Sequence, residues 1–213
     1  MISGSGVLRC LEAPAWGRGR HRTRTSRWAV PSGLMTIRSV GEMELIRIEY
    51  TWFMSIDLPG AGANTIYVNA TSAPLTINSL SPANRIFIGD SANGNLGAIA
   101  GAVTLRGLAN TVTINDSATT APMTYVMDAT HFSRTNTPTA ASIFYGGLSA
   151  SQFNVAQGNG GNDITINGTP TLSGGAISSI ALATGSGSDS VHADAGDAAI
   201  ELSGMRTRER LGR

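Results

Sequence analysis

Short triplets, in which two apolar residues flank a third residue, recur from Ile66 to Leu202 and constrain the fold more than any other feature of this chain. Alternation with a period of two places successive side chains on opposite faces of a strand, so each triplet predicts a strand with one buried face. The gap between triplet starts is most often nine to eleven residues, with a few gaps near sixteen to eighteen. This rhythm is typical of a solenoid. The triplets start at Ile66, Leu75, Ile86, Val103, Val112, Ile143, Phe153, Ile164, Ile180, Val191 and Ile200.

Repetition is also what such a sequence needs in order to fold. Each triplet supplies two inward side chains, worth about 1.5 to 3 kcal/mol apiece when fully buried. One coil cannot offset the entropy of its own ordering, whereas stacked coils share a core and a backbone ladder. We therefore expect a right-handed parallel β-helix or β-solenoid, as part of a longer array. If three triplets make one coil, the strands give about four coils. An antiparallel β-sandwich is the alternative, because regularly spaced turns suit it too.

Charge divides the chain into segments. Residues 1–57 carry eight Arg and five acidic residues, residues 58–205 carry three Arg and eight acidic residues, and residues 206–213 carry four Arg and one acidic residue. The absence of Lys excludes a P-loop and Schiff-base chemistry. We expect four parts, which are a basic leader that is disordered or non-native (1–42), an amphipathic strand that caps the array (43–60), the solenoid body (61–205) and a frayed basic tail (206–213).

An Asn follows several of the predicted strands. Because Asn tolerates left-handed backbone conformations, each of these residues predicts a corner where the chain changes face. The corners are expected at Asn69, Asn78, Asn115 and Asn167.

The stretch from Ile86 to Thr169 combines such strands with glycine-rich corners. The motifs are Ile88-Gly89-Asp90, residues 101–107, Val112-Thr113-Ile114-Asn115-Asp116-Ser117, residues 143–148 and residues 158–166. This stretch resembles repeat units of large bacterial surface and secreted proteins of the adhesin-like, right-handed parallel β-helix type. The resemblance implies a passive structural or adhesive rod on the cell exterior. It covers about two fifths of the chain.

Residues 184–192 are similar to the calcium-binding nonapeptide of the RTX type, in which Gly-Gly-x-Gly-x-Asp precedes an apolar residue. Gly185, Gly187 and Asp189 match that pattern. Thr184 stands in place of the first glycine.

Residues 158–166 match the same nonapeptide less well, because Asp163 fits while the apolar residues are one place out of phase. One turn supplies only half of an oxygen cage for calcium, so such sites need neighbouring copies. Asp163 and Asp189 are 26 residues apart, a spacing that allows them to stack as successive corners of a wide helix. The residues that would contact Ca²⁺ are Gly185, Gly187, Asp189, Asp163, Asp194 and Asp197.

Three of these aspartates, Asp189, Asp194 and Asp197, lie close in sequence to His192. Carboxylate and imidazole ligands at this spacing suit a divalent ion, and paired carboxylates suit work on a sugar. A solvated acidic corner is the competing interpretation. No Gly-x-Ser-x-Gly elbow occurs, and His131 has no spacing that ties it to a catalytic partner. We therefore assign no catalytic residue.

These observations predict a non-catalytic structural or adhesive module of an exported bacterial protein, placed outside the cell or on its surface, with weak calcium binding at acidic turns. A glycan, another extracellular surface or a second copy would be its partner. No stretch approaches eighteen apolar residues, so no transmembrane segment is expected. A β-helix polysaccharide lyase or glycosidase is the first alternative. Nucleic-acid binding through the Arg-rich leader is the second, although we expect no nucleic acid.

Overall fold

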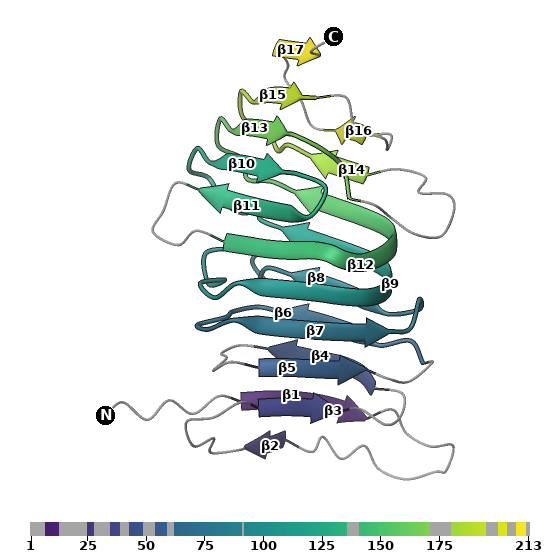
Figure 1. Ribbon diagram of the computed structural model, residues 1–213. Helices are drawn as coiled ribbons and strands as arrows, with labels where there is room; N and C mark the ends of the chain where they lie inside the picture. The colour runs from purple at the N-terminus through teal and green to yellow at the C-terminus, as the bar shows by residue number, and fades with distance from the viewer. Residues whose placement is uncertain are drawn as a thin grey trace, which may run out of the picture.

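The computed structural model describes residues 7–12, 25–27, 35–38, 43–48, 54–58, 62–90, 92–135, 141–170, 180–194, 200–203 and 208–211, with side chains described only from Ser55 to Ser203 within these ranges. The described chain is all-β, and it consists of strands joined by turns and loops without a helix (Figure 1). The predicted all-β class is confirmed.

The strands lie one above another from the N-terminal to the C-terminal end of the molecule (Figure 1). In chain order they are β1 (Val7–Glu12), β2 (Thr25–Arg27), β3 (Met35–Arg38), β4 (Met43–Ile48), β5 (Met54–Leu58), β6 (Thr65–Val68), β7 (Leu75–Leu80), β8 (Arg85–Ile88), β9 (Val103–Asn115), β10 (Thr124–Met127), β11 (His131–Thr135), β12 (Ala141–Ala156), β13 (Asp163–Ile166), β14 (Ile180–Ala183), β15 (Ser190–Ala193), β16 (Ile200–Ser203) and β17 (Arg208–Leu211).

The chain alternates between two ladders of hydrogen-bonded strands. Ladder A contains β4, β6, β8, the C-terminal parts of β9 and β12, then β14 and β16. Ladder B contains β3, β5, β7, the N-terminal parts of β9 and β12, then β11, β10, β13, β15 and β17. The long strands β9 and β12 belong to both ladders and connect them (Figure 1).

Parallel pairing dominates these ladders. Among the described strands, twelve pairings are parallel and four are antiparallel. The antiparallel pairings are β1 with β2 and β4, and β11 with β10 and β12. An antiparallel sandwich, the predicted alternative, accounts for these four pairings only.

The hairpin of β10 and β11 interrupts the parallel order of ladder B. The chain leaves β10, turns at Asp128 and returns along β11 between β10 and β12. The Asp128 Oδ1 atom accepts hydrogen bonds from the amides of Thr130 at 2.7 Å and His131 at 2.8 Å, which closes the turn. Ladder B therefore has two strands between β12 and β13, whereas β12 pairs directly with β14 in ladder A.

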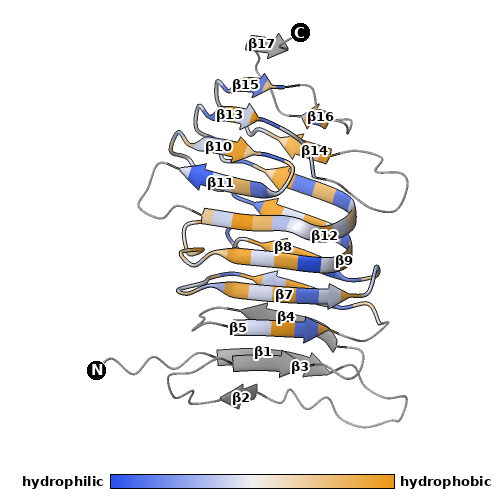
Figure 2. Cartoon of the chain, in the orientation of Figure 1, coloured by the Kyte–Doolittle hydropathy of each residue, from blue (hydrophilic) through white to orange (hydrophobic). Residues whose placement is uncertain are grey.

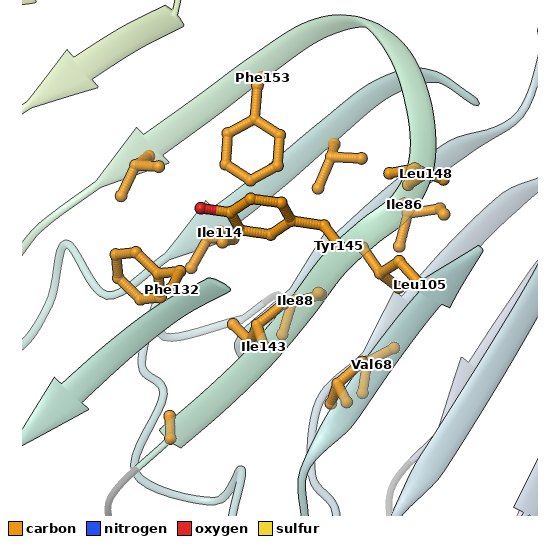
Figure 3. Close-up of a cluster of buried hydrophobic side chains, with 14 of the residues drawn as sticks. Val68, Ile86, Ile88, Leu105, Ile114, Phe132, Ile143, Tyr145, Leu148 and Phe153 are labelled. Carbon is orange, nitrogen blue, oxygen red and sulfur yellow. The ribbon is translucent and has the colours of Figure 1, made fainter. Parts of the chain in front are cut away.

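The parallel register places equivalent inward side chains in columns that form the core. Figure 2 shows hydrophobic residues alternating with polar ones along the strands, as one buried face requires. In ladder A, one column contains Ile66, Ile86, Val112, Phe153 and Ile180, and the next contains Val68, Ile88, Ile114, Val155 and Leu182. Where the hairpin joins the stack, aromatic rings fill the core (Figure 3). There Tyr145 meets Phe153 edge to face, with ring centroids 4.9 Å apart.

All eleven predicted triplets lie within strands. The flanking residues of the first nine triplets are buried, and so is Val191 in β15, whereas Ala193 in β15 and both flanking residues in β16, Ile200 and Leu202, are only partly buried. We call the chain from one strand of ladder A to the next a circuit, and each circuit contains two triplets, one in each ladder, where the sequence had suggested three as one possibility. The third side is a loop, which in one circuit makes only the isolated parallel bridge between Thr71 and Ile99. Period-two alternation identifies strands but does not say how many of them make one circuit.

Three of the four predicted Asn corners are found at strand ends. Asn115 ends β9, and Asn69 and Asn167 follow β6 and β13. The prediction for Asn78 is wrong, because this residue lies inside β7 with its side chain on the outer face. Its Nδ2 atom donates a hydrogen bond of 2.6 Å to Asp57 Oδ1 on the neighbouring strand β5.

The predicted capping strand of residues 43–60 is two strands in the structure. β4 pairs with β1 and β6, and β5 pairs with β3 and β7, so each has neighbours on both sides. A change of ladder does not disturb period-two alternation, so the sequence pattern could not reveal the division. The leader of residues 1–42 contributes β1, β2 and β3, and the expected tail of residues 206–213 contributes β17. The rest of both segments lies outside the described residues.

Gly107 makes the corner within β9 where the chain passes from ladder B to ladder A. Its φ is +91°, in the region that side chains disfavour. A Cβ atom at this position would lie 1.9 Å from the Ser79 carbonyl oxygen of the strand beside it. Both the backbone conformation and the close contact therefore require glycine.

Replacing Gly107→Ala should lower the free energy of unfolding by about 1 to 3 kcal/mol, because the corner must distort or β9 must separate from β7. Urea denaturation monitored by circular dichroism measures this. Gly147→Ala is the matched control, since its Cβ would meet Arg106 Cγ at an ordinary 3.5 Å. The control should change stability by less than about 0.5 kcal/mol. Equal effects of the two changes would contradict this account of the corner.

Candidate functional site

Two glycine-rich turns lie against each other at one corner of successive circuits. They comprise residues 157–162, before β13, and residues 184–189, before β15, and we call them together the Gly-Asx corner. Asp163 pairs with Ser190 in the parallel register, so each residue of the first turn has its counterpart 27 residues further along. The structure thus brings together the two segments that resemble the calcium-binding nonapeptide.

The two aspartates that were expected to stack do not face each other. Asp189 is the counterpart of Asn162, and its side chain is buried. Asp163 is one position further along and is exposed, because consecutive strand residues point to opposite sides. The prediction that Asp163 and Asp189 form successive corners of one site is therefore wrong by one residue in register.

Gly185 and Gly187 allow the two turns to approach closely. Gly185 has a φ of +85°, and a Cβ atom there would lie 2.2 Å from the Gly158 carbonyl oxygen. At Gly187 a Cβ atom would lie 2.1 Å from the Gly160 carbonyl oxygen. Close stacking of backbone alone thus accounts for these glycines, which the sequence pattern had linked to calcium.

His192 and Asp194 lie on the surface, separate from the buried side of the corner. The His192 Nε2 atom is 3.6 Å from Asp194 Oδ1, and both side chains are more than half exposed. Asp197 lies outside the described residues. In the part of the chain that the structure describes, no three His, Cys, Asp or Glu side chains gather closely enough to hold a metal ion among themselves.

Side chains of the Gly-Asx corner form a ladder of hydrogen bonds with the backbone of the neighbouring circuit. Asn162 Oδ1 accepts from the amide of Met123 at 3.2 Å, and Asp189 Oδ1 accepts from the amide of Asn162 at 2.9 Å. The Asn162 Nδ2 atom donates to the carbonyl oxygens of Gly158 at 2.7 Å and Thr184 at 3.2 Å. The same kind of hydrogen bond between a side chain and the backbone of a neighbouring circuit occurs earlier in the chain, where Asn84 Oδ1 accepts from the Asn64 backbone amide at 2.9 Å.

A buried ion pair, which the sequence analysis missed, lies next to this corner. Arg134 on β11 and Asp116 after β9 are 4% and 1% exposed. The Arg134 guanidinium donates to both Asp116 carboxylate oxygens, at 2.9 and 3.0 Å. The carboxylate also accepts from the Tyr125 hydroxyl at 2.8 Å, the Thr119 hydroxyl at 2.6 Å and the Leu96 amide at 2.9 Å.

The network joins the hairpin to the corner through Tyr125. Its hydroxyl accepts a hydrogen bond of 3.1 Å from the Gly158 amide while donating to Asp116. Burial, followed by the negative charge of Asp116, raises the pKa of Tyr125 above its ordinary value. The phenol therefore stays protonated and acts as a fixed donor.

The residues of this network are visible in the sequence, but one of them does not fit the pattern of apolar residues two apart that predicts a strand. Residues 124–127 and 131–135 alternate as strands do, yet one inward position is occupied by Arg134. A charged residue at an inward position hides the strand from a search for apolar triplets. An inward Arg on a predicted strand, with an Asp in a preceding corner, is the pattern that would have revealed it.

Asp128 holds the turn of the same hairpin. Burial acts to raise its pKa, but hydrogen bonds from the Thr130 amide and hydroxyl and from the His131 amide outweigh burial, so the pKa lies below its ordinary value of 3.8. The Tyr145 hydroxyl lies 2.7 Å from the carbonyl oxygen of Asp128 and 2.8 Å from that of His131, so the two carbonyls share its single proton. Burial, followed by the Asp128 charge, raises the pKa of Tyr145.

Comparison with known proteins gives this chain no relative, since no family model, no curated protein and no solved structure matches it. The resemblance to adhesin repeat units thus remains a prediction. No helix within the described residues is long and apolar enough to cross a membrane.

Replacing Arg134→Met should lower the free energy of unfolding by about 3 to 5 kcal/mol, because it leaves the buried Asp116 carboxylate without its ion-pair partner. Adding Asp116→Asn to that variant should restore part of the loss, since no unpaired charge then remains. Urea denaturation of the two single variants and the double variant measures the coupling. Strictly additive losses would show that the two side chains do not act as a pair.

Replacing Asp128→Ala should cost about 0.5 to 1 kcal/mol of stability at pH 7, a value reduced by solvent at this turn. Because the folded-state pKa is lowered, the contribution of Asp128 is fully present above the unfolded-state pKa and is lost as pH falls through the folded-state value. Wild type and variant should therefore converge in urea denaturation as the pH falls below the folded-state pKa of Asp128. Asp163→Ala, an exposed change, is the control, and a gap that persists in acid would refute the carboxylate's role.

Proposed function

We propose that this chain is a non-catalytic structural or adhesive module of an exported protein, built as a right-handed parallel β-solenoid. The observation that carries this is the parallel register of the two ladders, which stacks identical positions of successive circuits above one another. A parallel crossover between strands is nearly always right-handed. Such a stack gives a stiff body with long outer faces, which suits a spacer or a binding surface.

The outer face of ladder B supports the adhesive part of the proposal. Leu80 on β7 and Leu108 on β9 are register neighbours, and they are 59% and 38% exposed. Asn78 and Arg106 form the adjacent register pair on the same strands. Further along this face, Phe144 is 43% exposed and stacks on His131, with ring centroids 4.5 Å apart. Apolar, aromatic and hydrogen-bonding groups thus share one surface, a combination that binding sites use.

The charged groups of the interior support a structural role over a catalytic one. The Asp116 carboxylate already accepts hydrogen bonds from four residues and is almost completely buried. Its position beneath β10 and β11 keeps it from a polysaccharide in solution. These contacts give the buried pair of Asp116 and Arg134 a structural role, so polysaccharide cleavage is not needed to explain it.

The test is binding by the purified chain to immobilised acidic and neutral polysaccharides, with self-association followed in parallel by sedimentation. Replacing Leu80→Ser and Leu108→Ser together should reduce binding at least tenfold while leaving the fold intact by circular dichroism. Thr65→Ser with Thr111→Ser, on the outer face of ladder A, is the matched control and should bind as wild type does. Release of reducing or unsaturated sugars would contradict a non-catalytic module, and unchanged binding would exclude this face.

A further inference from the structure

Three buried oxygen atoms at the Gly-Asx corner have no hydrogen-bond partner. They are Gln157 Oε1, Thr184 Oγ1 and Asp189 Oδ2. Their residues are 2%, 0% and 5% exposed. An unpaired polar group away from water costs free energy, and a carboxylate oxygen costs the most. All three residues belong to this corner, so a further partner placed there would satisfy oxygen atoms that the protein leaves unpaired.

The three residues lie at the same corner of adjacent circuits. The register of β12 and β14 pairs Ala156 with Ala183, and the next residues, Gln157 and Thr184, continue this alignment. The Gln157 amide donates to the Ala183 carbonyl oxygen at 2.8 Å. Parallel neighbours are about 4.8 Å apart, so the two side chains stand next to each other.

Asn162 ties Asp189 to this pair. Its Nδ2 atom is 3.2 Å from the Thr184 carbonyl oxygen, and its backbone amide is 2.9 Å from Asp189 Oδ1. The buried oxygen of Asp189 is thus held at the corner that Gln157 and Thr184 occupy.

A comparison of Asn162 with Asp189 explains why one of them lacks a partner. The amide of Asn162 donates to two carbonyl oxygens, those of Gly158 and Thr184. Asp189, its counterpart one circuit later, places a carboxylate where Asn162 has an amide. An ionised carboxylate accepts and cannot donate, so it cannot repeat the bonds of the amide. A cation satisfies a carboxylate oxygen and nearby carbonyl oxygens at the same time.

We propose that the Gly-Asx corner binds a hard divalent cation, Ca²⁺, through Gln157 Oε1, Thr184 Oγ1 and Asp189 Oδ2. Amide, hydroxyl and carboxylate oxygens are ligands that Ca²⁺ accepts, and backbone carbonyls and water complete its shell of six to eight oxygens. With one carboxylate the affinity is in the range of about 10⁻⁴ to 10⁻³ M that is found for extracellular modules. The site differs from the nonapeptide pattern, because the exposed Asp163 and Asp194 do not contribute.

The first test is thermal unfolding of the full chain with and without Ca²⁺. About 10 mM Ca²⁺ should raise the unfolding midpoint of the wild type by about 3 to 10 °C, because the cation binds the folded state only. Asp189→Asn should abolish this shift and raise the midpoint without Ca²⁺, since an amide can repeat the hydrogen bonds of Asn162. The control Asp163→Asn should retain the wild-type shift.

The second test uses Tb³⁺ luminescence, with Tb³⁺ standing in for Ca²⁺. Tyr125 is a suitable sensitiser, because its hydroxyl contacts the Gly158 amide in the same corner. Emission should fall on adding Ca²⁺ and should be lost in Asp189→Asn and in Thr184→Val. Mg²⁺ should compete weakly, since it prefers a smaller and more regular shell.

Three outcomes would overturn the proposal. These are a wild-type chain that does not shift with Ca²⁺, an Asp189→Asn variant that shifts as the wild type does, and a shift that disappears in Asp163→Asn. If the wild-type midpoint does not shift with Ca²⁺ while Asp189→Asn is more stable than the wild type, water alone occupies the corner. The inference rests on the stacked circuits of the proposed module and not on its adhesive role. Binding of Asp189→Asn to polysaccharides should therefore match that of the wild type, which separates the two proposals.

Discussion

The parallel backbone register between neighbouring circuits is the constraint on which the rest of this structure depends. Once β6, β8 and the C-terminal part of β9 are aligned, each inward aliphatic side chain lies above its equivalent, and each corner meets its equivalent. The core columns, the close glycine contacts and the Asn and Asp ladder are all consequences of this alignment. Displacing one strand by one residue would turn its apolar side chains outward.

The sequence predicts the strands well because their signal is local. Apolar residues two apart place eleven of the strand segments correctly, including two within β9 and two within β12. The number of strands in one circuit is not a local property, so the triplets alone did not show that each circuit contains two of them. Strand β11 escaped for a different reason, since Arg134 stands at an inward position and its partner Asp116 is 18 residues away in the chain. Only the folded chain shows that the two neutralise each other.

The Gly-Asx corner shows that local sequence patterns are equally limited in identifying a binding site. The glycine and aspartate pattern pointed to two turns that the structure places side by side, yet it selected Asp163, which is exposed, and gave no reason to single out Gln157 or Thr184, whose buried oxygen atoms lack a hydrogen-bond partner. Which side chain faces inward depends on the register of β13 with β15, and this is set by contacts between circuits. Asn162 has an amide nitrogen where Asp189 has a second carboxylate oxygen, so Asn162 Nδ2 donates two hydrogen bonds while Asp189 Oδ2 has no hydrogen-bond partner.

The two strands of the hairpin, β10 and β11, make ladder B longer than ladder A, which has no strands at the equivalent position. Each added strand lengthens a ladder by about 4.8 Å, so one side of the stack is longer by about 10 Å at this level. When one ladder is longer than the other at the same level, the strands above that level are tilted relative to those below it. We therefore expect the stacking direction to change at β12, so that an array continuing on either side of the hairpin would bend at this point.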